Sequence, residues 1–404
     1  MSNRKDVLFL CQFFYPEHNS SATLPFDTAR YLAKNGLAVD VICGCPKEYS
    51  DGKRVPRKEE KDGVNIRRIG YIQLKRNRSV GRLINYFSFT ASAMMRLFKL
   101  RRYKSVVVYS NPPILPIVAV FGKLLFKTKI VFVAYDIYPE VAYASKSVRE
   151  GSLIDKGMRM INRMLFKRVD RVVALTDEMR EFLVENRKPV TAEQVVTVAN
   201  WAHENKIEPD DEAFARFGYS RDDFIVAYFG NMGICQEMQT LADAALKMQK
   251  REDVKFFFVG HGCKKDALEA FFNKNGCDNV KMYGFLTGKD FEQAVSVASC
   301  CVVSLESGLR GMCAPSKFYS YLQGGKPVLA IVEEGSYLEK EVEDNKLGRA
   351  VTIGDVDGLI GAISSLASNR EESAKMGARS GRRYEENYSM DIALEKYLEI
   401  IKSL

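Results

Sequence analysis

The sequence predicts an α/β fold built from two doubly wound, Rossmann-like parallel-sheet domains that follow one another along the chain. Short runs rich in β-branched and aromatic residues recur throughout, and helix-like stretches lie between several of them. The pattern lapses once, in a polar, acid-rich segment at 201–223, after which a second series of runs begins. A length of 404 residues allows two or three domains, each with its own core.

In the first half, the expected strands are short apolar runs separated by polar or helix-like sequence. They cover residues 7–14, 38–44, 105–110, 129–136, 171–176 and 194–200. A helix is expected over 22–34, because the Asn35-Gly36 pair that follows is a stop signal.

In the second half, the same alternation predicts strands at 224–230, 254–260, 279–285, 300–306, 326–332 and 349–354. We therefore expect an N-terminal domain at 1–200, a C-terminal domain at 201–383, and a last helix at 384–404 that crosses between the domains. Such sheets bind ligands at the carboxyl ends of their strands, so two of them facing each other would make a cleft.

Charge is distributed unevenly, because residues 1–200 carry a net charge of about +16 and residues 201–404 about −7. The segment 75–104 has basic residues at both ends and apolar residues at helical spacing between them. It is either a core helix with solvated ends or a helix that meets an anionic membrane surface or a lipid acceptor. Nucleic acid fits less well, because aromatic and basic side chains do not interleave.

Cysteine usage and hydropathy indicate a cytoplasmic protein. The nine cysteines are odd in number and never stand in a CxxC spacing, so we expect reduced thiols and no zinc site. The N-terminus lacks the pattern of a signal peptide. The longest uncharged stretch, 105–122, contains three prolines that would break a spanning helix, so we expect no transmembrane segment.

The first loop, at 15–22, leaves a strand and enters a helix, so backbone N–H groups at the helix start could hold an anion. Ser20 or Ser21 is the expected N-cap, and plain capping is the alternative interpretation.

The run 135–140 closes a strand and places two acids at its carboxyl edge. Asp136 could orient a sugar hydroxyl or take a proton there. The alternative is that Asp136 and Glu140 cap the next helix.

A glycine-containing turn at 230–233 follows the first strand of the second half. Gly230 and Gly233 would permit close backbone approach to a phosphate before a helix that begins near Gln236. The turn at 260–262 is a weaker signal of the same kind, and a simple strand-to-helix connection explains either.

The stretch 310–328 is the most informative. Lys317 lies just inside an expected helix start, where its charge and the helix dipole would both attract a diphosphate. Gly324-Gly325 ends that helix, and a strand follows.

Taken together and in order, these motifs resemble the family 4 glycosyltransferases of the GT-B fold, in particular the bacterial subgroup that adds sugars, often N-acetylated amino sugars, to lipid-linked precursors of surface polysaccharides. The matching motifs are FYPE (14–17 within the first strand and loop), SNPP (110–113), YDIYPE (135–140), RVVALTDEM (171–179), VANW (198–201), YFGNMG (228–233), FFFVGHG (256–262) and APSKFYSYLQGGKPVLA (314–330).

The resemblance implies a nucleotide sugar held by the C-terminal domain, an acceptor held by the N-terminal domain, retention of anomeric configuration, and no metal or other cofactor. It assigns catalysis to Asp136, Lys317 and, by position and charge, Arg310. The implied donor-binding residues are Gly230, Asn231, Gly233, Gln236, Gly260, His261, Phe285, Leu286, Pro315, Ser316 and Ser320. The implied acceptor-binding residues are Glu17, His18, Ser20, Ser21, Tyr135 and Glu140.

The sequence departs from the family pattern at several of these positions. Tyr135 stands where many members have His, and Asn231 and Gln236 stand where Arg and Lys are common. Met312 and Ser320 replace a pair of glutamates, of which the second usually contacts the nucleotide ribose.

The function expected from sequence is transfer of a sugar, from a UDP-linked amino sugar, to a polyprenyl-diphosphate-linked saccharide in capsule or O-antigen assembly, by an enzyme peripheral to the inner face of the cell membrane. Two alternatives stay open. One is a catalytically degenerate scaffold subunit of a partner transferase, and the other is a sugar-nucleotide epimerase of the same fold.

Overall fold

The computed structural model describes residues 4–46, 54–74, 79–203 and 210–404. The chain divides into two compact units, each described here by itself. Unit 1 contains Met1–Asn200, Gly311–Ala314 and Asp391–Leu404, and unit 2 contains Trp201–Arg310 and Pro315–Met390. Two α/β units with parallel sheets confirm the predicted fold class.

Unit 1 is organised around a sheet that, within the described residues, has eight strands in the order β3-β4-β2-β1-β5-β6-β7-β8. All neighbours are parallel except the antiparallel pair β3 and β4. The strands are β1 Lys5–Leu10, β2 Val39–Gly44, β3 Lys58–Lys61, β4 Val64–Ile69, β5 Tyr103–Tyr109, β6 Lys129–Ala134, β7 Arg171–Ala174 and β8 Val195–Thr197.

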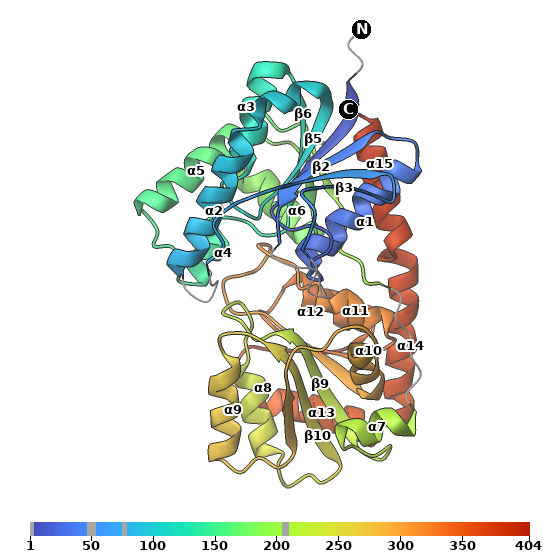
Figure 1. Cartoon of the computed structure of the whole chain (residues 1–404). Coiled ribbons are helices and arrows are strands. Elements are labelled where there is room, and N and C mark those ends of the chain that lie inside the picture. Colours follow the sequence, from blue (N-terminus) through green and yellow to red (C-terminus); the bar gives the residue numbers. More distant parts are fainter. Residues whose placement is uncertain (1–3, 47–53, 75–78, 204–209) are drawn as a thin grey trace. The chain divides into compact units, whose positions relative to one another are not determined.

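Helices cover both faces of this sheet (Figure 1), which explains why its central strands are apolar at consecutive positions. On one face, strand residues such as Leu8, Val106 and Ile130 pack in a core with α2, α3 and α5, while α1 and α15 cover the other. The helices are α1 Ser20–Lys34, α2 Ser79–Met94, η1 Leu97–Arg102 (a 3₁₀ helix), α3 Pro116–Phe126, α4 Glu140–Ala144, α5 Leu153–Phe166, α6 Asp177–Asn186 and α15 Met390–Lys402.

The hairpin of β3 and β4 is absent from the sequence prediction. β3 has the sequence KEEK and lies at the sheet edge, so it lacks the apolar run that marks the central strands. The turn between the strands is Asp62-Gly63, with φ of +50° and +78°. Asp-Gly is a strong hairpin signal that could have revealed the pair.

The basic segment 75–104 is not one helix, which corrects the sequence prediction. Residues 75–78 lie outside the described residues; α2 then ends at Met94, η1 follows, and β5 begins at Tyr103. Phe89 and Ala93 of α2 are buried in the unit 1 core, so this part of the segment is a core helix. Lys104 is on β5 and pairs with Asp6 at 2.7 Å.

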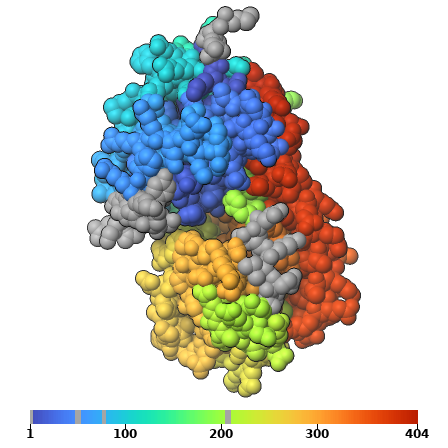
Figure 2. All heavy atoms as spheres, turned by 45° about the vertical axis from the view of Figure 1, so that its right-hand side comes forward, coloured from blue at the N-terminus to red at the C-terminus, as the bar shows by residue number. Residues whose placement is uncertain are grey.

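The C-terminal region also differs from the single helix expected at 384–404. α14 ends at Asn387, and α15 begins at Met390. α15 belongs to unit 1, where Figure 2 shows the end of the chain (red) beside N-terminal residues (blue). The hydroxyl of Tyr31 in α1 donates a hydrogen bond to Glu395 Oε2 at 2.7 Å.

Unit 2 contains a sheet with six parallel strands within the described residues, in the order β11-β10-β9-β12-β13-β14. The strands are β9 Phe224–Asn231, β10 Val254–His261, β11 Val280–Tyr283, β12 Cys300–Ser304, β13 Val328–Val332 and β14 Gly348–Thr352. The helices are α7 Asp211–Phe217, α8 Gln239–Lys247, α9 Lys265–Lys274, α10 Gly288–Val297, α11 Lys317–Gln323, α12 Tyr337–Asp344, α13 Val356–Ser368 and α14 Arg370–Asn387.

Large aromatic side chains fill both faces of the unit 2 sheet. Phe224, Val226 and Phe258 pack in a core with α8, α9 and α13. On the other face, the ring of Phe229 contacts Phe291 of α10 and Tyr321 of α11. Packing on both faces of the sheet fixes the carboxyl ends of its central strands. The predicted donor-site residues of the turn after β9 lie at this edge.

Candidate functional site

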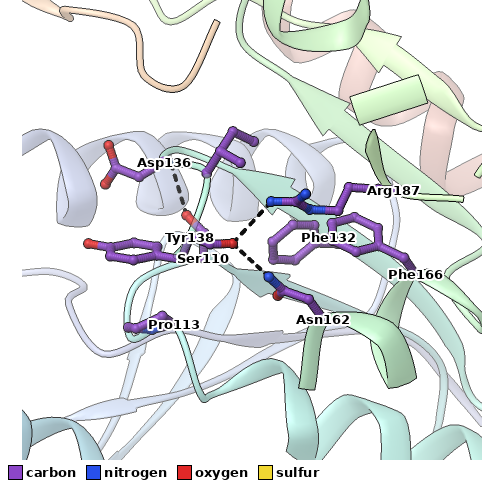
Figure 3. Close-up of a pocket in the computed structure, with 9 residues that line it drawn as sticks. Ser110, Pro113, Phe132, Asp136, Tyr138, Asn162, Phe166 and Arg187 are labelled. Carbon is purple, nitrogen blue, oxygen red and sulfur yellow. Dashed lines mark hydrogen bonds between the residues drawn. The ribbon is translucent and has the colours of Figure 1, made fainter. Parts of the chain in front are cut away.

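In unit 1, the predicted acid Asp136 lies directly beyond the end of β6. Its backbone N–H donates a hydrogen bond to the Oγ of Ser110, which follows β5, at 3.1 Å (Figure 3). Because β5 and β6 are paired parallel strands, their carboxyl ends meet here. Burial raises the pKa of Asp136 from 3.8 to about 6. The group is therefore ionised at neutral pH yet able to bind a proton slightly below it.

Asp136 is one of the residues that line a small pocket (Figure 3). The others come from the segment after β5, from β6 and the loop that follows it, from α5, and from Arg187 at the end of α6. The Tyr138 carbonyl accepts hydrogen bonds from Asn162 Nδ2 at 2.6 Å and from Arg187 Nη2 at 3.3 Å. Arg187 also pairs with Glu140 at 2.5 Å. The carboxylate of Asp136 points away from Arg187, so Asp136 and Glu140 have different environments.

The segment Gly311–Ala314, which precedes α11 in the chain, is part of unit 1 and packs onto the end of β6. Cys313 forms an antiparallel bridge with Asp136, and the Ile137 N–H donates to the Met312 carbonyl at 2.8 Å. The Gly311 N–H donates to Glu178 Oε2 at 3.0 Å. Sequence reasoning missed these contacts, because nothing local in 311–314 indicates partners at 136–137 and at 178, which are more than 130 residues earlier in the chain.

Met312 packs against the unit 1 core, as does Tyr135, whose ring centroid lies 5.1 Å from that of Tyr109. These are two of the positions where the sequence departs from the family pattern. At both positions the side chain is partly buried and packs against the unit 1 core.

The first loop does not form the predicted cap, which is a correction. α1 begins at Ser20, so Asn19 is the N-cap, and its carbonyl accepts from Ala22 N–H at 2.8 Å. Ser20 and Ser21 are therefore in the first turn of α1. Glu17 is half-buried and His18 is exposed.

In unit 2, backbone packing requires glycine at Gly260, a predicted donor-binding residue, and at Gly262 of the same turn. A Cβ atom on Gly260 would lie 1.9 Å from the Gly230 carbonyl oxygen, and one on Gly262 would lie 2.3 Å from the Met232 carbonyl oxygen. The ends of β9 and β10 approach so closely that only glycine fits at these positions.

Lys317, the first residue of α11, extends toward the end of β9. Its Nζ lies 3.7 Å from the centroid of the Tyr228 ring, and its Cε would be 3.6 Å from a Cβ on Gly230. Nζ is buried and has no hydrogen-bond partner among the described residues. Burial lowers the pKa of Lys317 from 10.5 to about 7. A buried ammonium without a hydrogen-bonding group beside it is suited to an anionic ligand.

The turn after β9 is closed by predicted donor-site residues. Gln236 Oε1 accepts from the Gly233 N–H at 3.1 Å and from Asn231 Nδ2 at 3.5 Å. The helix that follows begins at Gln239, slightly later than predicted. Sequence reasoning missed Lys264, which donates to the Gln236 carbonyl at 2.6 Å and forms an ion pair with Glu306.

His261 and Phe285 form an open aromatic corner at the ends of β10 and β11. Their ring centroids are 5.2 Å apart in an edge-to-face arrangement, and Phe285 is 57% exposed. Leu286 follows and is half-buried. An exposed phenylalanine with one edge held by a histidine can stack on a planar ligand.

The remaining predicted residues lie around the start of α11. Ser316 is its N-cap, and the Pro315 carbonyl accepts from Phe318 N–H at 3.1 Å. Ser320 is half-buried one turn into the helix. Arg310 is exposed, and its Nη1 would be 3.2 Å from a Cβ on Gly335, in the loop before α12.

Two broader features bear on the chemistry. In the ranges the structure describes, no group of three or more His, Cys, Asp or Glu side chains is arranged to hold a metal ion. None of the described helices combines the length and the apolar character that crossing a bilayer requires.

Comparison with known proteins gives matches along both halves. Residues 26–201 match the family described as "Glycosyl transferase 4-like domain", and residues 223–369 match "Glycosyl transferases group 1". The protein named "Probable glycosyltransferase WbjE" of Pseudomonas aeruginosa is 23% identical over 331 residues, which is 81% of each chain. O-antigen chain mannosyltransferase C of Escherichia coli is 21% identical over 212 residues, 52% of this chain and 55% of that protein.

Solved structures resemble the whole chain. Sucrose-phosphate synthase from Thermosynechococcus elongatus superposes with a TM-score of 0.75 at 15% identity, covering 99% of both chains. Anabaena HepE in complex with UDP and glucose gives a TM-score of 0.73 at 15% identity, covering 99% of this chain and 100% of that one. WaaG, described as a glycosyltransferase involved in lipopolysaccharide biosynthesis, gives 0.71 at 13% identity, covering 98% and 99%. These likenesses show the fold.

Proposed function

The chain belongs to the family 4 glycosyltransferases of the GT-B fold, and on this premise we propose that it transfers a sugar, with retention, from a UDP-linked donor to a polyprenyl-diphosphate-linked saccharide. The donor is an N-acetylated amino sugar in this proposal. The product is a precursor of a surface glycan such as capsule or O-antigen, in keeping with an O-antigen transferase among the relatives.

The observation that carries the proposal is the buried ammonium of Lys317. It lies against Tyr228 and beside Gly230, with no hydrogen-bond partner among the described residues. A departing nucleoside diphosphate carries the charge that this ammonium can stabilise, and a cation held in place before the reaction stabilises developing charge without reorganisation. In the metal-independent reaction that the family resemblance implies, this contribution falls to side chains and backbone N–H groups.

The donor's other parts are assigned to neighbouring groups of unit 2. Asn231, Gly233 and Gln236 line the diphosphate, and the corner of His261 and Phe285 receives the base. HepE, which has the same fold, is described in complex with UDP and with UDP-glucose. Arg310, Pro315, Ser316 and Ser320 remain proposed contributors at the start of α11.

Asp136 is assigned to the acceptor in unit 1. At neutral pH, its carboxylate accepts a hydrogen bond from the acceptor hydroxyl and orients it. The acceptor oxygen bonds to the anomeric carbon as the bond from that carbon to the diphosphate oxygen breaks, and the acceptor proton passes to the departing diphosphate. Tyr135, Glu140 and the first loop with Glu17 and His18 would contact the rest of the acceptor.

Thermal unfolding with UDP, GDP, ADP and their sugars tests the donor site, because a ligand at a hundred times its Kd adds about 2.7 kcal/mol to the free energy of unfolding. We expect a rise with uridine nucleotides. Lys317→Ala should lower kcat more than tenfold with a smaller effect on KM, while Lys274→Ala on the exposed side of α9 should change neither. No rise with any nucleotide would favour the scaffold alternative, and unchanged turnover in Lys317→Ala would refute the role of Lys317.

A further inference from the structure

A groove in unit 1 lies away from the Asp136 edge and is rich in cations. It is lined by the start of β1, the β3–β4 hairpin and η1, and Figure 2 shows the segments near residue 60 (blue) and residue 100 (cyan) on one face of this unit. Lys5 pairs there with Asp40 at 2.7 Å. Six other cations of the groove have no ion pair with the described residues: Arg4, Lys58, Arg67, Lys99, Arg101 and Arg102.

These cations converge closely enough to affect one another. Burial lowers the pKa of Lys99, and the charges of Arg67, Arg96, Arg102 and Lys58 lower it further. Three acids also line the groove, Asp40, Glu59 and Glu60, of which Asp40 pairs with Lys5 and Glu59 with Arg68, so positive charge is in excess. Clustering of like charges costs free energy in the absence of an anion, and a concave surface with an excess of positive charge concentrates anions from solution. The groove therefore favours a phosphate-bearing ligand.

An apolar surface adjoins the groove through η1. In a 3₁₀ helix, residues three apart lie on the same side, so Phe98 shares a side with Arg101. Phe98 is 69% exposed, Met95 before it is 76% exposed, and the Phe98 ring lies 5.8 Å from that of Phe126 at the end of α3.

The outer face of α3 continues this apolar surface. Its exposed residues are Phe121, Leu124 and Leu125, which stand at i, i+3 and i+4 and so share one face. The outward face of a surface helix is ordinarily polar. We name Met95, Phe98, Phe121, Leu124 and Leu125 the apolar ledge.

We propose that the cationic groove and the apolar ledge together dock on an anionic phospholipid bilayer, with head-group phosphates in the groove and the ledge at the acyl boundary. A free phosphate would account for the groove alone, and an uncharged apolar partner for the ledge alone. A bilayer surface offers both chemistries side by side. The inference rests on the proposed function in that the acceptor is membrane-anchored. Within the segment 75–104 it places the contact on Met95 and η1 and not on α2, and it adds α3 and the β3–β4 hairpin.

Co-sedimentation of the full chain with vesicles tests the proposal. We expect strong partition onto vesicles of 70% phosphatidylcholine and 30% phosphatidylglycerol, weakening as salt is raised, and little onto phosphatidylcholine alone. The variant Lys99→Gln/Arg101→Gln/Arg102→Gln should bind roughly a hundredfold more weakly. The variant Phe98→Ser/Leu125→Ser should bind at least tenfold more weakly.

The matched control is Lys250→Gln/Lys274→Gln/Lys402→Gln, which removes the same charge from exposed positions outside the groove and should partition like the unmodified protein. Circular dichroism of each variant checks that it folds. Equal binding by the groove variant and this control overturns the proposal. The proposal is also overturned if calorimetry shows that the protein binds tripolyphosphate in the groove but co-sedimentation shows no binding to vesicles. The groove would then be a site for a free anion.

The same preparations are heated with UDP, which separates the two proposals. Stabilisation by UDP without vesicle binding overturns the docking surface and leaves the transferase assignment standing. Vesicle binding that depends on the groove and ledge, without stabilisation by any nucleotide, supports the docking surface and counts against the donor site.

Discussion

Cys313 forms an antiparallel β-bridge with Asp136, and it stands four residues before Lys317 in the chain. Asp136, which we propose orients the acceptor, is therefore paired through its backbone with the segment that precedes Lys317, the residue proposed to bind the donor. Met312 adds a second link, because its carbonyl accepts from the Ile137 N–H at 2.8 Å. The position of Gly311–Ala314 should thus influence the environment of Asp136.

Replacing Glu178 tests that influence. Glu178 Oε2 accepts from the Gly311 N–H at 3.0 Å, and a hydrogen bond to a charged group contributes about 1.5–3 kcal/mol. We expect Glu178→Ala to lower kcat several-fold and to shift the acid limb of the kcat–pH profile to lower pH, because a loosened segment exposes Asp136 to water. Glu181→Ala, at an exposed position of the same helix, is the control. A lower rate with an unmoved pH profile would mean that Glu178 acts on stability alone.

Asp136→Asn should stabilise the protein at pH 8 while abolishing turnover. The pKa of Asp136 is raised from 3.8 to about 6, so the native state holds a proton that the unfolded chain releases between these values. Stability from this group is complete below pH 4 and is lost as pH rises through 6. Asparagine resembles the protonated acid, so we expect a gain of at most about 3 kcal/mol at pH 8 and none at pH 4.

Urea unfolding at the two pH values measures the effect of Asp136→Asn. Asp344→Asn, on an exposed residue of α12, should show no pH-dependent gain. Equal stability of the Asp136→Asn protein and the unmodified protein at pH 8 would contradict the burial of this charge.

The strands of both sheets could be predicted because buried parallel strands are apolar along their whole length, as in the runs at 105–110 and 256–260. The same reasoning missed β3 and β4, since an edge hairpin needs no such run. It singled out Lys317 by its place just inside a helix start and by the family resemblance, and the structure adds that Lys317 lies beside Tyr228 and Gly230. Sequence reasoning did not find the bridge to Cys313, which depends on tertiary packing.

Sequence also gave an incomplete account of the glycines. Gly260 stays a predicted donor-binding residue, and the structure adds a packing reason for it and for Gly262, because a Cβ at either position would meet the backbone of Gly230 or Met232. Likewise, helical spacing at 75–104 could not reveal that the helix ends at Met94 and that the exposed apolar surface continues on α3. Which apolar face is covered depends on neighbours that are distant in the chain.

Gly260→Ala should destabilise unit 2 severely. The added Cβ would lie 1.9 Å from the Gly230 carbonyl oxygen, and the neighbour is backbone that cannot move aside cheaply. We expect a loss of more than about 3 kcal/mol in urea unfolding. Gly361→Ala is the control, because that glycine is inside α13, a Cβ there meets nothing within 4 Å, and alanine should stabilise the helix by up to about 1 kcal/mol. Similar stability of the two variants would refute the close approach of β9 and β10.

Binding of UDP should take up a proton above pH 7 if Lys317 contacts the diphosphate. Burial lowers the pKa of Lys317 to about 7, so in the ligand-free protein the side chain is mostly neutral at pH 8.5. A bound diphosphate favours the charged form, which raises this pKa and couples binding to protonation. UDP affinity should therefore fall as pH rises from 7.5 to 9, by up to tenfold per pH unit, in a range where the phosphate itself stays ionised.

Calorimetry in buffers of different ionisation enthalpy measures this uptake, which should approach one proton per UDP at pH 8.5. Lys317→Arg is the decisive variant, because arginine stays charged throughout this range. It should bind UDP without proton uptake and with little dependence on pH, whereas Lys317→Met should bind weakly at every pH. Proton uptake that persists in Lys317→Arg would assign the titration to another group and remove the main support for Lys317 as the residue that stabilises the leaving diphosphate.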